Sequence, residues 1–136
     1  QAAEIIPLYR QLIDLGEPPR AIVSDSLFWR EIGSVEAYRA LYRELTTLPG
    51  DTLAPLQSGK EVFIHPQGEV SPRAELRGMI AVGRKSCVEK GAILENVILW
   101  DHVTVRENSL LRDCIITDGV EVRGTHENEI LIQTKS

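Results

Sequence analysis

The sequence predicts a mainly β protein, a parallel β-helix preceded by an α/β segment with two helices. The first observation is a period: between Ile64 and Val122 a branched aliphatic residue returns at every sixth position, except for two steps of five. This period fits neither an α-helix nor an alternating strand, but short strands joined by regular corners produce it. The aliphatic positions are Ile64, Val70, Leu76, Val82, Val88, Leu94, Leu99, Val105, Leu111, Ile116 and Val122.

The second observation is an internal repeat. Residues 92–106 align without gaps with residues 109–123, at an offset of seventeen. Each turn of the chain then contributes three strands, and successive turns stack at the strand spacing of about 4.8 Å. The two short steps are three steps apart, so we expect 94–98 and 111–115 on the same face. A β-sandwich, the alternative, does not repeat its residues at a fixed offset.

The position four residues after each aliphatic one supports the same arrangement. Most of these residues are small or β-branched, as expected where a corner leaves little room. They are Gly68, Ala74, Ile80, Ser86, Ala92, Ile98, Val103, Ser109, Ile115 and Val120. With this pattern the region resembles the hexapeptide-repeat proteins, and the resemblance implies a left-handed coil. Such a coil is an exception to the usual right-handed crossover of parallel strands.

Before the repeat, the chain predicts one helix and one strand. Leu8, Leu12 and Leu15 recur at helical spacing, and Gly16 is a typical residue for the C-terminal end of a helix. Residues 20–28 are rich in β-forming side chains at their start, which predicts a strand.

A second helix is predicted to begin after Ser34, a good N-cap, with Glu36 in its first turn where the helix dipole favours a negative charge. Its apolar stripe is Tyr38, Leu41, Tyr42, Leu45 and Leu48. The Pro- and Gly-containing stretch that follows predicts a linker, so we divide the chain into 1–48, 49–61 and 62–136. Because an open coil needs covers at its ends, this helix is expected to cap the first turn.

Composition narrows the functional classes. The chain has 136 residues and a formal net charge of -5, which argues against a nucleic-acid surface because phosphate binding needs clustered basic residues. No stretch approaches the length of apolar residues that a membrane span requires, so we expect no membrane partner. Cys87 and Cys114 have neither a metal-type spacing nor the number typical of a disulfide framework. They are expected to be reduced packing residues, and the cytoplasm is the expected compartment.

A short motif carries the functional hypothesis. Residues 28–38 read FWREIGSVEAY, which resembles the pattern W-x-D-x-G-[ST]-x-[ED] near the end of the catalytic domain of sugar-1-phosphate nucleotidyltransferases, the nucleotide-sugar pyrophosphorylases. In that family a helix and a strand precede the motif, and a helix, a linker and often a left-handed β-helix follow it. The same order spans nearly this whole chain and is most similar to the mannose-1-phosphate guanylyltransferase and glucose-1-phosphate branches.

The resemblance implies a reaction and a metal. The intact enzyme would make an NDP-sugar and pyrophosphate from an NTP and a sugar 1-phosphate, with Mg²⁺ held partly by the acidic residue of the motif. Here that residue is Glu31, one methylene longer than the family's Asp. Mg²⁺ takes one or two protein carboxylates and leaves its other positions to water and phosphate. Trp29 is expected to be a core residue.

The family's glycine-rich phosphate loop, G-x-G-x-R-x-x-P followed by Lys, does not occur in these residues. We therefore expect no catalysis by this chain alone. Its predicted role is an oligomerisation or regulatory module, with its own N-terminal catalytic domain and further copies of itself as partners, and NTP and sugar 1-phosphate as ligands of the intact enzyme.

Two alternatives follow from the repeat. A hexapeptide-repeat acyltransferase would use a histidine as general base toward an acceptor, with acyl-CoA along the coil between subunits. The resemblance to such enzymes implies more turns than this repeat supplies and an extended loop that encloses the cofactor. The β-helical carbonic anhydrases bind zinc at a subunit interface through three histidines, two of them only a few residues apart. The histidines here are His65, His102 and His126, whose gaps of 37 and 24 residues lack that close pair. His65 and His102 are expected at corners.

Overall fold

The computed structural model describes residues 5–23, 29–47 and 61–133. The chain divides into two compact units, residues 1–31 and residues 32–136, which we describe separately. The described helices are α1 (Ile5–Asp14) and α2 (Val35–Thr47). The strands are β1 (Val62–Ile64), β2 (Glu69–Val70), β3 (Glu75–Val82), β4 (Cys87–Val88), β5 (Ile93–Leu99), β6 (Thr104–Val105), β7 (Leu110–Arg112), β8 (Ile115–Ile116), β9 (Glu121–Val122), β10 (Thr125–Glu127) and β11 (Ile130–Leu131).

The first unit contains α1, which ends as predicted. Gly16 has φ +75°, its amide donates to the carbonyl of Ile13 at 3.0 Å, and the amide of Glu17 donates to the carbonyl of Leu12 at 2.9 Å. These two bonds form a Schellman motif, which satisfies carbonyls that the end of a helix leaves unpaired. Residues 20–23 form no strand, and 24–28 lie outside the described residues, so the predicted strand over 20–28 is wrong for its described part.

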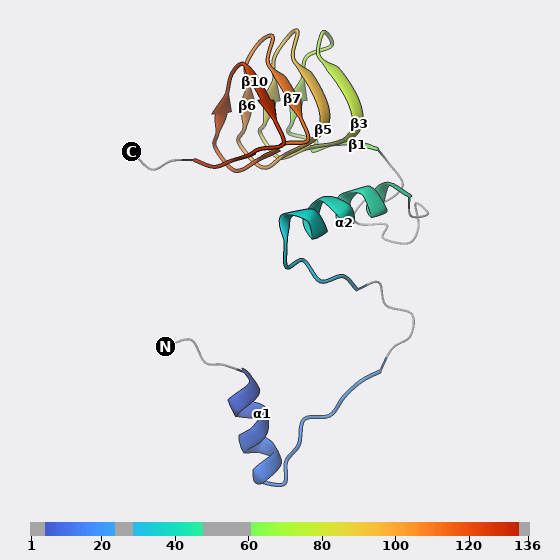
Figure 1. The fold of residues 1–136 in the computed structure, drawn as a ribbon, viewed down its shortest axis with the longest axis vertical. Helices are drawn as coiled ribbons and strands as arrows, with labels where there is room; N and C mark the ends of the chain where they lie inside the picture. The colour runs from blue at the N-terminus through green and yellow to red at the C-terminus, as the bar shows by residue number, and fades with distance from the viewer. Residues whose placement is uncertain (1–4, 24–28, 48–60, 134–136) are drawn as a thin grey trace. The chain divides into compact units, whose positions relative to one another are not determined.

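The second unit contains a parallel β-solenoid of about four turns, which confirms the predicted mainly β fold with two helices before it (Figure 1). One sheet runs β1-β3-β5-β7-β10, with β8 pairing β5 and β11 pairing β8, and the other runs β2-β4-β6-β9. Every pair of strands is parallel, as stacked turns of one coil require. The left-handed sense of the coil stays a prediction.

The register of the strands reproduces the sequence repeat. Leu94 pairs with Leu111 and Leu99 with Ile116, so the offset of seventeen is one turn of the coil. The two short steps lie on the same face, as predicted. The last turn is shorter still, since Leu111 pairs with His126, fifteen residues later.

One corner of the coil explains the short steps. In β3 the register shifts between Arg77 and Ile80, which gives the first full turn one residue more than the next. The residue that turns this corner adopts a left-handed conformation: φ is +64° at Gly78, +54° at Asn96 and +50° at Asp113. Glycine, asparagine and aspartate are the residues that accept this conformation most readily.

The aliphatic ladder forms the core of the coil. From Val82 to Val122 every predicted position is buried, while Val70 and Leu76 pack against the core and Ile64 is partly exposed in the first turn. Small residues fill the corners: the hydroxyl of Ser86 donates to the carbonyl of Trp100 at 2.6 Å and accepts from the amide of Val103 at 2.9 Å.

Two residues of the small-residue pattern face the other way. Ile98 and Ile115 lie in a second cluster outside the coil, and the core positions are taken by Val97 and Cys114. The physical reason is that this corner contains two residues in β3, Gly78 and Met79, but only one, Asn96, in β5. Side chains alternate along a strand, so this missing corner residue moves the residues that follow it to the opposite face. The second cluster consists of Met79, Ala81, Ile98 and Ile115.

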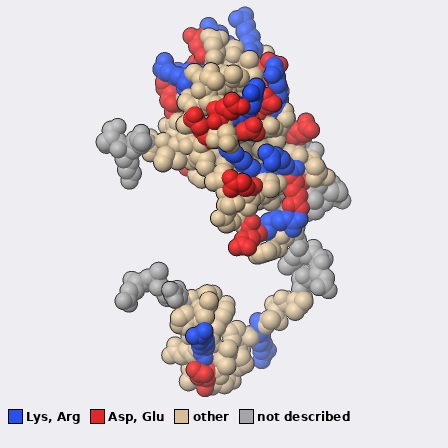
Figure 2. All heavy atoms as spheres, in the orientation of Figure 1, with Lys and Arg blue, Asp and Glu red and all other residues tan. Residues whose placement is uncertain are grey.

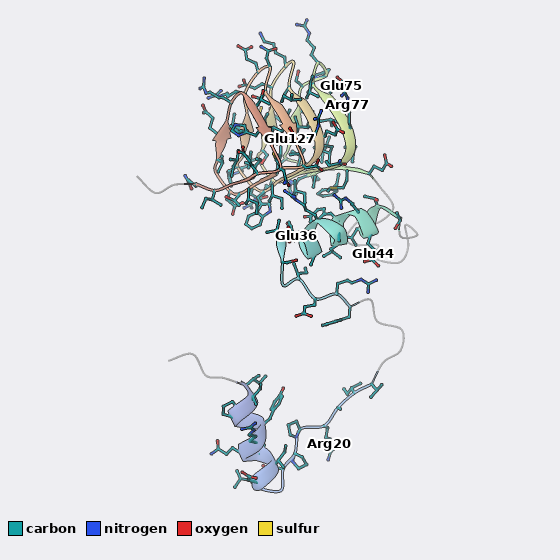
Figure 3. The ribbon with its side chains drawn as sticks, in the orientation of Figure 1. Arg20, Glu36, Glu44, Glu75, Arg77 and Glu127 are labelled. Carbon is teal, nitrogen blue, oxygen red and sulfur yellow. The ribbon has the colours of Figure 1, made fainter. Side chains whose placement is uncertain are left out.

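Charges alternate along the outside of the coil, where equivalent residues of neighbouring turns lie next to each other (Figures 2 and 3). Arg112 is held between Glu95, at 3.1 Å, and Glu127, at 3.3 Å. Arg106 instead binds Glu121 of the next turn, which lies opposite Thr104, at 2.7 Å, and its hydrogen bond lowers the pKa of that carboxyl to about 2. These ion pairs are largely exposed, so each is expected to contribute little to stability.

Candidate functional site

The motif leads directly into α2. Residues 29–33 form neither helix nor strand, and the Ser34 hydroxyl accepts a hydrogen bond from the amide of Ala37 at 3.1 Å. Ser34 is therefore the predicted N-cap, and Glu36 lies in the first turn. The serine of the motif thus sets where the helix begins.

Trp29 and Glu31 are both exposed. Trp29 is 72% exposed, so the prediction that it is a core residue is wrong within the described structure. It lies in a segment without regular structure, which offers a large ring nothing to pack on. Glu31 is one exposed carboxylate, which fits Mg²⁺ because that ion needs only one or two from the protein. Its metal role stays a prediction.

Helix α2 lies along the side of the coil, whereas the sequence suggested that it caps the first turn. Val35, Tyr38 and Tyr42 pack against the second cluster, which spans three consecutive turns. The apolar face that the missing corner residue creates on the outside of the coil is the reason for this position.

An arginine fixes the helix to later turns. Arg39 donates to the carbonyl of Asp113 at 2.6 Å and to the side-chain oxygen of Asn128 at 2.8 Å. Both acceptors belong to residues that turn the same corner with positive φ. Residues of α2 therefore contact the coil from β3 to the last turn.

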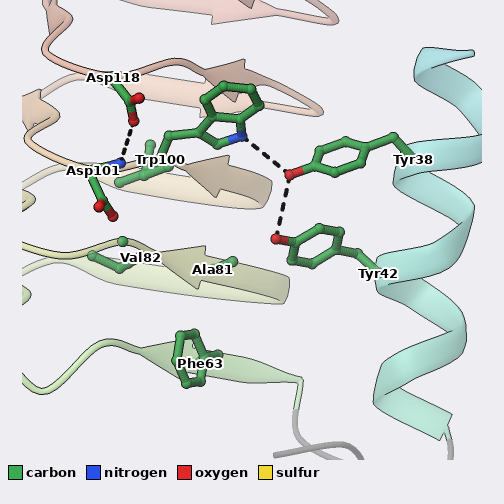
Figure 4. A pocket seen from close by; sticks show the side chains of 10 residues that line it. Tyr38, Tyr42, Phe63, Ala81, Val82, Trp100, Asp101 and Asp118 are labelled. Atoms are coloured by element: carbon green, nitrogen blue, oxygen red, sulfur yellow. Dashed lines mark hydrogen bonds between the residues drawn. The ribbon is translucent and has the colours of Figure 1, made fainter. Parts of the chain in front are cut away.

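A groove lies where α2 meets the sheet (Figure 4). Trp100 donates from its indole nitrogen to the Tyr38 hydroxyl at 3.2 Å, and the Tyr38 hydroxyl donates to that of Tyr42 at 3.4 Å. An indole N–H can only donate, so the Tyr38 oxygen is the acceptor of the first of these bonds, and it keeps a second lone pair and its own proton for the contact with Tyr42. Burial raises the pKa of Tyr42 well above its ordinary value, which keeps this hydroxyl protonated.

Small residues make the groove. Ala81 pairs with Phe63 of the turn before, and Gly83 lies two residues after Ala81 at the corner. Neither Ala81 nor Gly83 has a large side chain that could fill the space beside Phe63. The resulting space is about 320 Å³, within the range of small-molecule sites. Asp101 and Asp118 lie at its edge, where each accepts a hydrogen bond from a backbone amide of the neighbouring turn. The aromatic rings and the hydroxyl and carboxylate groups that line the groove could contact a small ligand or another side chain.

The histidines do not meet. His65 lies between β1 and β2, His102 turns a corner with φ +58°, and His126 pairs with Glu129 at 2.9 Å. Among the residues that the structure describes, no three His, Cys, Asp or Glu side chains gather closely enough to hold a metal ion. The corner positions predicted for His65 and His102 are confirmed.

Cys87 and Cys114 are free thiols, as predicted, and Cys114 is buried in the core. The acyltransferase alternative needs an extended loop along the coil. Between 62 and 133, successive turns advance by only 15 to 18 residues, as the pairs Val62–Ile80 and Thr125–Leu110 show. The described turns therefore give that alternative no such loop.

The groove is not predicted by the sequence, although two of its residues are. Tyr38 and Tyr42 belong to the predicted stripe of the second helix. Their meeting with Trp100 depends on α2 lying on the side of the coil, which no short-range pattern specifies.

The fold defines the class of this chain: a parallel β-solenoid with a helix docked on one face. No protein-family model matches it, and a search of curated proteins finds no match either. Neither described helix is long and apolar enough to span a membrane.

Replacing Arg39 by methionine is expected to loosen α2. Both hydrogen bonds to the coil would be lost, and bonds from a charged donor are worth about 1.5–3 kcal/mol. We expect the amides of α2 to exchange with deuterium about tenfold faster, measured by mass spectrometry. Arg43→Met, an exposed position of the same helix, is the control. Equal acceleration in both variants would contradict the docking role.

Proposed function

We propose that this chain is the C-terminal region of a sugar-1-phosphate nucleotidyltransferase, in which the β-solenoid acts as an oligomerisation or regulatory module. The observation that carries the proposal is the link between motif and coil. Residues 29–34 end in the N-cap of α2, and α2 is packed and hydrogen-bonded to the side of the solenoid. Glu31 therefore lies three residues before the N-cap of a helix that is docked on the coil.

Exposed apolar side chains support a role in association. Trp100 is 41% exposed, and Ile32 and Ile130 line the same hollow beside the N-terminal end of α2. Apolar surface of this kind is typical of contacts between proteins. We propose homo-oligomers through this side of the coil, and the catalytic domain of the intact protein as the intramolecular partner.

In the intact enzyme, the sugar phosphate would attack the α-phosphorus of the NTP, forming one P–O bond while the bond to pyrophosphate breaks. Glu31 would supply one carboxylate ligand to Mg²⁺, which neutralises the triphosphate when bound. The mannose-1-phosphate guanylyltransferase-like branch is the proposed relative, and the cytoplasm the proposed compartment.

The test uses the protein encoded by the complete reading frame. It is expected to release pyrophosphate from an NTP and a sugar 1-phosphate, with GTP and mannose 1-phosphate as the first pair tried, and only with Mg²⁺. Residues 1–136 alone are expected to release none. An intact protein that turns over no pair of NTP and sugar 1-phosphate would overturn the proposal.

Glu31→Gln in that protein is expected to raise the Mg²⁺ concentration needed for half-maximal rate about tenfold or more. The glutamine keeps the size of the side chain and removes the charge that favours the cation. Glu36→Gln, five residues on in the first turn of α2, is the matched control. An unchanged Mg²⁺ requirement in the Glu31 variant, with activity intact, would remove Glu31 from the metal site.

A further inference from the structure

The last turn of the coil breaks the apolar ladder at two places. His126 pairs with Leu111, so it continues a column that otherwise contains Leu76, Leu94 and Leu111. Glu129 comes directly before Ile130, which pairs with Ile115, and it therefore follows Val97 and Cys114 in the neighbouring column. Two titratable residues thus occupy places that hold core residues in earlier turns.

The two side chains satisfy each other. Nδ1 of His126 lies 2.9 Å from a carboxylate oxygen of Glu129, and Nε2 lies 2.9 Å from the carbonyl oxygen of Arg123. A carboxylate and a carbonyl can only accept, so both ring nitrogens must carry hydrogen for both bonds to form. The imidazolium ion is the form that makes both bonds, and the hydrogen bond to Glu129 favours this form by raising the pKa of His126.

Two neighbouring charged groups are paired with each other. Glu121 and Arg123, which line the same hollow as His126, bind each other at 2.6 Å. Glu121 also binds Arg106 of the turn before at 2.7 Å. His126 and Glu129, in contrast, continue the apolar columns of the earlier turns.

The strands of this turn are the last in their ladders among the described residues. β9, β10 and β11 each have a neighbour on one side only, so no described strand pairs with their other edge. Such an edge is a template for strands of another chain. Val122 in β9 belongs to the core, and Leu131 in β11 packs against it, so apolar side chains lie next to this edge. An apolar pair in place of His126 and Glu129 would complete a surface on which a further turn could stack.

We infer that His126 and Glu129 form a polar plug that ends the stack and prevents a second copy of the chain from adding its strands to this edge. A second copy would have to cover an imidazolium and a carboxylate and remove their water, which is costly even for a pair. The inference goes beyond the proposed association through the side of the coil, because it names the surface that is closed to association.

The test replaces the plug by the residues of the earlier turns, in the double variant His126→Leu with Glu129→Val. Sedimentation velocity is expected to show species larger than the wild type, with a weight-average mass that rises at least about twofold with concentration, since head-to-tail contacts do not close on themselves. The matched control is Arg123→Leu with Glu127→Val. It also removes one charge of each sign and adds similar apolar groups, but at outward positions of the same end.

A plug variant that keeps the wild-type circular dichroism and sediments like the wild type would overturn the inference, as would equal association by the control. If the double variant does not fold, Glu129→Val alone is compared with Glu127→Val. Association of the first and not of the second supports the plug, and identical behaviour contradicts it. None of these outcomes depends on enzymatic activity, so they are separate from the test of the proposed function.

Discussion

Leu111→Ala is expected to lower the free energy of unfolding by about 2–5 kcal/mol. Leu111 is fully buried, with Leu94 in the turn before it and His126 in the turn after it. Hydrogen-bonded strands hold the neighbouring turns at fixed spacing, so the coil cannot collapse into the cavity that the alanine leaves. Urea denaturation followed by circular dichroism measures the change.

Leu110→Ala is the matched control, since it removes the same atoms from the adjacent position of the same strand. Leu110 lies on the outer side of β7 and is only partly buried. We expect a loss of less than about 1.5 kcal/mol, because less apolar area is removed from water at this position. Equal losses for the two variants would mean that the inward column is not the core.

Gly83→Ala is the second substitution with a large expected effect. A Cβ atom at Gly83 would lie 2.4 Å from the carbonyl oxygen of Trp100 and 2.8 Å from the Asp101 carboxylate. The first neighbour is backbone of the next turn and cannot move without breaking the ladder. We expect a loss of about 3 kcal/mol, at the upper end of what overpacking costs, with a shift in the fluorescence of Trp100.

Gly124→Ala separates crowding from backbone conformation. Gly124 has φ +83°, which disfavours alanine, but nothing lies within 4 Å of the added Cβ. The expected loss is about 1–2 kcal/mol, the cost of the left-handed conformation alone. If Gly124→Ala cost more than Gly83→Ala, close packing of the turns would not be what requires glycine at position 83.

The coil itself could be predicted because its information is local and repeated. One aliphatic residue in each strand fixes the inward face, and the offset of seventeen fixes the register between turns. The two short steps even placed 94–98 and 111–115 on one face. Periodicity carries no handedness, which is why the left-handed sense depends on the resemblance alone.

The deviations from the pattern within the coil come from a single corner. Counting four residues from each aliphatic position groups Ile98 and Ile115 with the small corner residues, because that count assumes that every strand keeps the same alternation. The missing corner residue turns both outward, and the apolar face that results holds Tyr38 and Tyr42. The position of α2 on the side of the coil, and the groove beside Trp100, follow from this shift.

Only part of the candidate site could be predicted from the sequence. The motif predicted the N-cap at Ser34, because a cap depends on residues three positions apart. Whether Glu31 binds Mg²⁺ depends on groups elsewhere in the intact protein. A short sequence motif can therefore only propose this role. The sequence offers His126 only as a metal ligand or a general base. Its position next to Leu111 follows from the length of the last turn, which is fifteen residues and cannot be derived from the repeat of seventeen.

The most direct test of this account is the set of backbone contacts between strands, measured by nuclear Overhauser effects in the labelled protein. The account predicts contacts of the parallel type between residues one turn apart, such as Ile93 with Leu110 and Thr104 with Glu121. Contacts of the antiparallel type between consecutive strands would contradict the stacked coil, and with it the docked helix, the polar plug and the proposed module.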